Sequence, residues 1–288
     1  MKIVLRRVVI LKSIVMIAIT VVASTAALAD TFDWRNVGSL GLDYMTPVQD
    51  QGAASTCWAF AAVGALEAKF DIYNSNPNLN LNLSEQHLVC DGSMGGIDGG
   101  WEYMALNYFR TNNIVNEATL PYTDMDTSPL WPLTTPYDLY GITANQNWLD
   151  CTTNNLKNNL ITNGPLVTFI DADVDFYSPS GIVMDNSMPD YYEAGLKAGL
   201  EAWHAVVIAG FVDDTLMPSG GYWIVKNSWG ASWNGDGYGY ITYGVTEARD
   251  RTHALTGDPF IVTVPVPGAV LLGILGLGAV GIKLRRYA

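Results

Sequence analysis

The residue pattern changes character at about residue 141, and this change limits the folds that the chain can adopt. Before it, apolar residues recur in helix-like stretches such as CWAFAAVGALEAKF (57–70) and EYMALNYF (102–109), joined by loops rich in Asn, Pro, Asp and Gly. After it come strand-like runs such as PLVTFIDA, WHAVVIAGF and GYGYITYG, separated by Gly-containing turns. The pattern predicts an α+β protein with a helical lobe at about 46–140 and an antiparallel β lobe at about 141–250. A functional site is expected in the cleft between them.

Cys57 stands where a polar turn meets an apolar helix. Ser55 and Thr56 are residue types that cap helices, so Cys57 is expected in the first helical turn. Unpaired amides and the positive end of the helix dipole lower the pKa of a thiol there. A cysteine on an apolar helix is more commonly a small buried hydrophobe, so a chemical role requires a base and an orienting group elsewhere.

His204 and Asn227 are the candidates for these two groups. His204 lies in WHAVVIAGF, about 147 residues after the cysteine, and Asn227 lies in YWIVKNSWG. Each alone has an ordinary explanation, as a core histidine or a turn residue. In this order and spacing, however, the three blocks resemble the active-site blocks of the papain-like cysteine peptidases. LSEQHLVCD (83–91) and GGW (99–101) resemble two further blocks of that family.

The resemblance extends from about Phe32 to Gly244 and implies the two-lobe papain-like fold. It also implies a cysteine-type peptidase in which a Cys57 thiolate, paired with the imidazolium of His204, attacks a peptide carbonyl and forms a covalent acyl-enzyme. Asn227 would orient the imidazole. A thiol pKa lowered from about 8.5 to about 4 corresponds to roughly 6 kcal/mol in favour of the ion pair.

Gln51 precedes Cys57 by six residues, which is the offset of the family's oxyanion-binding glutamine. The resemblance implies that its side-chain amide and the backbone amide of Cys57 hold the oxyanion, and losing one such donor typically costs about 10²–10³ in rate. Trp229 is implied to shield the bond between His204 and Asn227 from solvent.

The substrate pocket is expected around Gly99, Gly100 and Trp101, whose loop is implied to line the cleft and pair with the extended substrate backbone. Trp101 would wall the pocket for the substrate residue two before the cut. Phe169 and Ala205 are expected to complete an apolar pocket, which predicts a preference for an apolar residue there.

The chain departs from the family pattern at several positions. Ala54 and Ile97 stand where family members carry a disulfide, and Ser55 replaces a usual glycine of the nucleophile loop. Cys90 and Cys151 remain, and they could pair in an oxidising compartment.

The formal net charge of −13 is concentrated in the middle of the chain, because basic residues cluster at both ends. Such an acidic excess argues against nucleic acid and anionic lipid surfaces as partners and weakly favours basic substrates. No cofactor or metal is expected. Asp171, Asp173 and Asp175 begin like a calcium loop, but Phe176 and Ile182 occupy its glycine and glutamate positions, and no zinc-ligand spacing occurs.

Residues 1–29 have a basic start, an apolar run and Ala27-Leu28-Ala29, which predict a secretory signal cleaved after Ala29. This leaves 30–258 as the peptidase domain, with no room expected for an amino-terminal prosegment.

Residues 259–288 contain Val-Pro-Val-Pro, an apolar run from Gly268 to Ile282 and a terminal Lys/Arg cluster. As a helix that run would rise about 22 Å, short of the ~30 Å hydrocarbon core. The segment resembles a PEP-CTERM sorting signal of the VPxP type, which an exosortase processes. A single-span tail anchor is the alternative. Either way, the peptidase domain is expected outside the cytoplasm and transiently tethered to a membrane.

The sequence therefore predicts an exported, surface-sorted cysteine-type endopeptidase that acts on polypeptides. Two alternatives remain open. The acyl-enzyme could pass to an amine, as in a transpeptidase or amidase, or the fold could serve as a non-catalytic cell-surface binding module.

Overall fold

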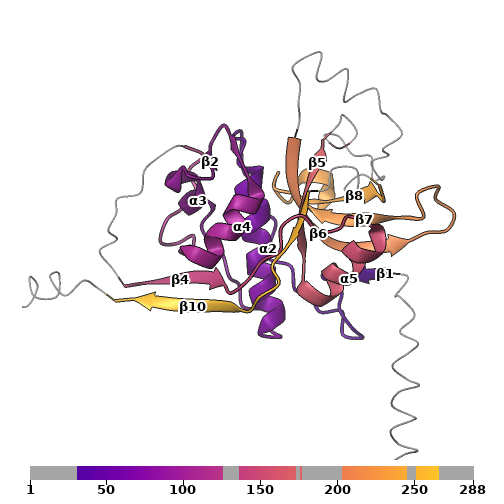
Figure 1. The fold of residues 1–288 in the computed structure, drawn as a ribbon, viewed down its shortest axis with the longest axis horizontal. Helices are drawn as coiled ribbons and strands as arrows, with labels where there is room; N and C mark the ends of the chain where they lie inside the picture. The colour runs from indigo at the N-terminus through magenta and orange to yellow at the C-terminus, as the bar shows by residue number, and fades with distance from the viewer. Residues whose placement is uncertain (1–30, 126–135, 173–175, 177–202, 245–250, 266–288) are drawn as a thin grey trace, which may run out of the picture.

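The computed structural model describes residues 31–125, 136–172, 176, 203–244 and 251–265. The expected signal sequence and the apolar run from Gly268 to Ile282 lie outside these ranges. The described residues form a helical lobe and a β lobe side by side (Figure 1), which confirms the α+β two-lobe prediction.

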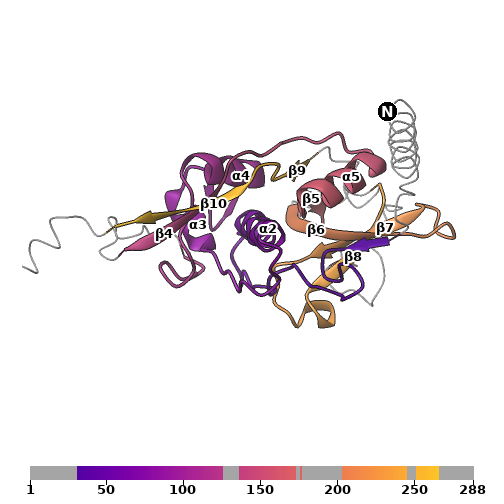
Figure 2. The ribbon, with the colours of Figure 1, turned by 90° about the horizontal axis from the view of Figure 1, so that it is seen from below.

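The helical lobe is built around α2 (Cys57–Tyr73), with α3 (Glu85–Asp91) and α4 (Glu102–Thr111) packed against it. A short hairpin of β2 (Gly95–Gly96) and β3 (Gly99–Gly100) lies beside the start of α2. The side chains of α2 are buried on every face of the helix and are mostly apolar, as is typical of a buried helix. Figure 2 shows the reason, because α2 lies between the other helices and the β lobe.

The β lobe contains an antiparallel sheet in the order β8-β7-β6-β5-β9, with β1 also pairing with β6. The strands are β1 (Thr31–Asp33), β5 (Leu166–Asp171), β6 (Trp203–Asp213), β7 (Gly221–Lys226), β8 (Tyr238–Thr242) and β9 (Thr252–Ala254). A short 3-10 turn, η1 (Trp233–Gly235), precedes β8, and α5 (Thr153–Asn163) packs against β6. The central strand β6 faces α2, so residues at its start lie at the boundary between the lobes.

A second antiparallel ribbon joins β4 (Tyr137–Ile142) to β10 (Pro259–Val264), residue for residue along their length. Figure 1 shows it extending from the helical lobe. The domain boundary expected at residue 258 thus falls immediately before a strand of the fold, and β10 belongs with the preceding domain.

The three cysteines form no disulfide, so the possible pairing of Cys90 with Cys151 is not present. Where the family's bridge is absent, the backbone N–H of Ser55 donates to the carbonyl of Ile97 at 2.7 Å. A hydrogen bond therefore joins the nucleophile loop to the β2–β3 hairpin.

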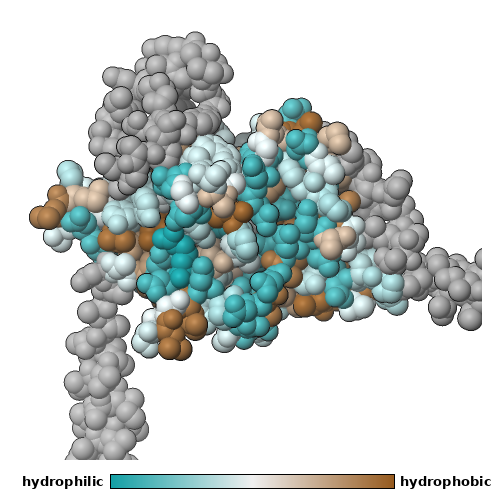
Figure 3. All heavy atoms as spheres, turned by 180° about the vertical axis from the view of Figure 1, so that it is seen from behind, coloured by the Kyte–Doolittle hydropathy of each residue, from teal (hydrophilic) through white to brown (hydrophobic). Residues whose placement is uncertain are grey.

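The face seen from behind is mostly hydrophilic, and its hydrophobic residues lie in small separate groups (Figure 3), which suits a chain with a large acidic excess. No helix within the described ranges is both long and apolar enough to cross a membrane.

Candidate active site

Cys57 is the first residue of α2, as the sequence predicts. Thr56 does not cap the helix with its side chain. Its hydroxyl lies 2.7 Å from the Tyr122 hydroxyl instead. The first amides of α2 therefore lack intrahelical acceptors and a side-chain cap. The Cys57 side chain is buried and lies in hydrogen-bonding contact with the backbone of Ala205, the residue after His204.

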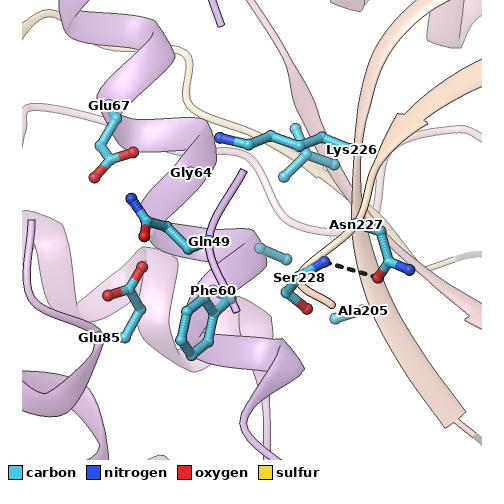
Figure 4. Close-up of a pocket in the computed structure, with 11 residues that line it drawn as sticks. Gln49, Phe60, Gly64, Glu67, Glu85, Ala205, Lys226, Asn227 and Ser228 are labelled. Atoms are coloured by element: carbon cyan, nitrogen blue, oxygen red, sulfur yellow. Dashed lines mark hydrogen bonds between the residues drawn. The ribbon is translucent and has the colours of Figure 1, made fainter. Parts of the chain in front are cut away.

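His204 is fixed by a hydrogen bond of 2.7 Å between its Nε2 and Oδ1 of Asn227. The backbone N–H of Ser228 also donates to that oxygen, at 2.7 Å (Figure 4). Because this oxygen is an acceptor, Nε2 of His204 must carry the hydrogen. In the neutral ring, Nδ1 then keeps its lone pair and can act as a base.

Two aromatic rings cover this histidine. Trp229 lies with its ring centroid 4.5 Å from that of His204, and Phe176 lies 5.9 Å from it. Phe176 also packs against Trp229 at 5.5 Å. Trp229, which is expected to shield the bond between His204 and Asn227, thus packs against the histidine ring. The sequence did not single out Phe176 for this site, because no local pattern links it to the histidine strand.

Burial acts against the ion pair of Cys57 and His204 that is expected from sequence. Burial raises the pKa of the Cys57 thiol to about 11, although hydrogen bonds from the backbone of Ala205 and Trp58 act in the opposite direction. Burial also lowers the pKa of His204 to about 4, against the effect of Asn227. The desolvation cost thus outweighs the helix terminus. Burial therefore favours the neutral thiol and the neutral imidazole, and the ion pair expected from sequence stays a prediction.

Gln51 is held by both ends of its amide. Its Nε2 donates to the carbonyl of Ala54 at 2.7 Å, and its Oε1 accepts from the Ser228 hydroxyl at 2.6 Å. Since a carbonyl can only accept, the first bond settles which amide atom is nitrogen. One Nε2 hydrogen remains for another acceptor. Ser228 was not anticipated, because it lies 177 positions from Gln51 in the chain.

The β2–β3 hairpin lies against the start of α2 because Gly100 has no side chain. A Cβ there would come within 2.4 Å of the Trp58 ring, and Gly99 has a φ of +133°. The Trp58 indole N–H also donates to the Gly96 carbonyl at 3.4 Å. An open hollow of about 510 Å³ is lined by this hairpin together with Ser93, Met94, Trp101 and Met104.

Phe169 and Ala205 are register partners on β5 and β6, so the structure brings these two predicted pocket residues together. Trp101 is 42% exposed and belongs to the opposite lobe. Trp203 and Arg251, which the sequence did not indicate, lie between Trp101 and Phe169. The Trp203 ring lies 6.0 Å from that of Phe169, and the guanidinium of Arg251 lies over both Trp101 and Trp203.

A buried polar cluster joins the lobes behind the histidine. Nζ of Lys226, the residue before Asn227, donates to the Thr46 hydroxyl at 2.9 Å, and that hydroxyl donates to Glu67 at 2.6 Å. Burial lowers the pKa of Lys226 and raises that of Glu67. Figure 4 shows Lys226 and Glu67 at a cavity of about 20 Å³, room for about one water molecule. Within the described ranges, no three His, Cys, Asp or Glu side chains are arranged to hold a metal ion.

Comparison with known proteins agrees with this geometry. The chain is 32% identical over 217 residues to a viral cathepsin of Cydia pomonella granulosis virus, covering 74% of this chain and 57% of that protein. It is 34% identical over 231 residues to procathepsin L of Felis catus, covering 76% and 60%. It thus spans somewhat more than half the length of these relatives.

Among solved structures, digestive procathepsin L2 proteinase from Tenebrio molitor larval midgut matches with a TM-score of 0.63 and 28% identity. That match covers 84% of this chain and 70% of the other. Residues 28–256 match the family described as papain family cysteine protease. The chain therefore belongs to the papain family of cysteine proteases.

Proposed function

We propose that the chain is a cysteine-type endopeptidase that hydrolyses polypeptides through a covalent intermediate on Cys57. The observation that carries this proposal is the 2.7 Å hydrogen bond between His204 and Asn227. His204 lies on β6, and the backbone of the next residue, Ala205, contacts the cysteine. The bond orients an imidazole with Nδ1 available as a base, beside the thiol at a helix terminus.

In the proposed mechanism, His204 is the base that takes the proton of the Cys57 thiol. The Cys57 sulfur bonds to the peptide carbonyl carbon as its proton moves to His204. The remaining Nε2 hydrogen of Gln51 and the backbone N–H of Cys57 stabilise the oxyanion. His204 then donates its proton to the leaving amine. It subsequently takes a proton from the water that hydrolyses the thioester, restoring the thiol.

The substrate backbone lies along Gly99 and Gly100 in this proposal, with the substrate residue two before the cut entering between Trp101 and the pair Phe169 and Ala205. The open hollow beside the hairpin supports this placement. Trp229 contributes by covering His204.

Hydrolysis of internally quenched peptides by the full-length protein tests the function. Cys57→Ala is expected to abolish turnover, and Cys57→Ser to reduce it by several orders of magnitude, because a hydroxyl is a poorer nucleophile than a thiol. Cys90→Ala serves as the matched control and should leave turnover unchanged. Turnover retained in Cys57→Ala would contradict the proposal.

We also propose that the protein is exported, cleaved after Ala29, and tethered through residues 259–288 until an exosortase processes them. The amino-terminal signal pattern and the Val-Pro-Val-Pro segment support this. Cell fractionation combined with mass determination of both termini tests it. Intact termini on a cytoplasmic protein would contradict it.

A further inference from the structure

The guanidinium of Arg251 occupies a position between the two lobes. Its central carbon lies 5.4 Å from the ring centroid of Trp101, in the helical lobe, and 4.5 Å from that of Trp203, in the β lobe. Both contacts are within the range of cation–π attraction. Two indole rings thus hold the guanidinium in place, and Arg251 as a whole is only half-buried, so a ligand could reach part of its side chain.

This guanidinium has no anionic partner in the described part of the chain. Arg251 forms no ion pair there, and its Nη1 is buried without a hydrogen-bond partner. Burying an unpaired donor of a charged group is costly, and arginine stays charged throughout the physiological pH range. An unmet requirement for an acceptor therefore exists at this point.

The carboxylate of Glu102, the residue after Trp101, forms no ion pair with Arg251: its Oε1 pairs with His253, and its Oε2 is buried without a hydrogen-bond partner. Its Oε1 lies 3.0 Å from Nε2 of His253. The backbone N–H of Trp148 donates to Nδ1 of that histidine at 3.1 Å, so Nε2 carries the hydrogen that Glu102 accepts. Pairing with His253 leaves the Arg251 charge available.

The position of Arg251 relative to the reacting groups is fixed from both sides. Trp203 immediately precedes His204, and its ring packs on Phe169. Trp101 immediately follows Gly100, which lies against Trp58 beside Cys57. A side chain that enters between the two tryptophans would therefore belong to a substrate residue close to the bond that is cut.

We propose that Arg251 is a specificity-determining residue that binds the carboxylate of an aspartate or glutamate two residues before the cut. This deepens the proposed function and rests on it. It replaces the apolar preference expected from sequence, because the aromatic walls enclose a cation. A planar guanidinium matches a carboxylate in two-point geometry, which an isosteric amide cannot reproduce.

The test compares kcat/KM for matched peptides that differ only in Glu or Gln at that position. The wild-type protein should prefer Glu by about 10- to 100-fold, the range expected for a charge-assisted hydrogen bond. Arg251→Met keeps the length and apolar stem but should bring the Glu-to-Gln ratio to near one. Arg251→Glu should shift the preference to Lys. Arg110→Met, at an exposed arginine of α4, should keep the wild-type ratio.

Two outcomes would overturn the proposal and leave Arg251 as a structural link between the lobes. The first is a Glu-to-Gln ratio of kcat/KM near one in the wild-type protein, and the second is an unchanged wild-type ratio in Arg251→Met. Calorimetry of the binding of the same two peptides to the Cys57→Ala variant separates this proposal from the catalytic one. If no peptide is cleaved but Glu still binds 10- to 100-fold more tightly than Gln, the peptidase proposal fails and the Arg251 site stands.

Discussion

Burial of His204 predicts an unusually low acid limit for catalysis. Burial lowers the pKa of this imidazole from 6.5 to about 4, which corresponds to roughly 3 kcal/mol against the charged ring. A depressed pKa means that the base form is fully available above about pH 5 and is lost as pH falls through 4. The kcat/KM profile of the wild-type protein should therefore have its acid limb near pH 4, because kcat/KM reports the pKa values of the free enzyme.

Trp229→Ala perturbs this limit directly, since the indole lies 4.5 Å from the imidazole. Removing it admits water to one ring face and restores part of the lost hydration. The acid limb should rise toward 6.5 by about one unit, or ~1.4 kcal/mol. Stopped-flow hydrolysis between pH 3.5 and 8, with circular dichroism at each pH, measures the shift. Trp148→Ala is the matched control, because Trp148 is exposed and has no ring contact with His204 among those of the described residues.

A wild-type acid limb near 6.5 would refute the argument, because it would mean that burial does not control this histidine. An acid limb that does not move in Trp229→Ala would show that the indole does not supply the desolvation.

Three further substitutions test other parts of the site. Asn227→Ala should lower kcat/KM by about 10- to 100-fold by releasing the imidazole, and Asn227→Asp, which keeps the acceptor, should recover most of it. Gln51→Ala should lower kcat by about 10²–10³ with little change in KM, measured by steady-state kinetics; an effect mainly on KM would argue against an oxyanion role. Lys226→Met should reduce the free energy of unfolding by about 3–5 kcal/mol, because it leaves Glu67 buried without its cation. The double variant Lys226→Met with Glu67→Leu should lose less free energy of unfolding than the sum of the two single variants, as measured by urea denaturation. A loss equal to that sum would contradict an interaction between Lys226 and Glu67.

The sequence predicted those features that have local signatures. A polar turn followed by an apolar stretch placed Cys57 at a helix start, and the strand pattern placed His204 inside a sheet. The order and spacing of the cysteine, histidine and asparagine blocks then indicated the fold through their resemblance to the papain-like peptidases.

The features that escaped prediction depend on pairs far apart in the chain. Ser228 reaches Gln51 across 177 positions, and Lys226 reaches Thr46 across 180, and neither pairing leaves a local pattern. Arg251 follows a stretch with no clear periodicity, so its place between two tryptophans emerged only from the fold. The helix position, which acts to lower the thiol pKa, is visible in sequence, whereas the depth of burial, which acts to raise it, is not.

Cys57 is proposed to carry the acyl group during turnover, and mass analysis of the intermediate tests this role. A chromogenic peptide ester should give a burst of about one equivalent, followed by slower steady-state turnover. After rapid acid quench and trypsin digestion, the three cysteines fall in separate peptides, 36–69, 70–110 and 111–157, because cleavage follows Lys and Arg. The account predicts the acyl mass on peptide 36–69 alone, with acylation greatly slowed in His204→Ala. Turnover with no adduct, or an adduct on either of the other two peptides, would contradict it.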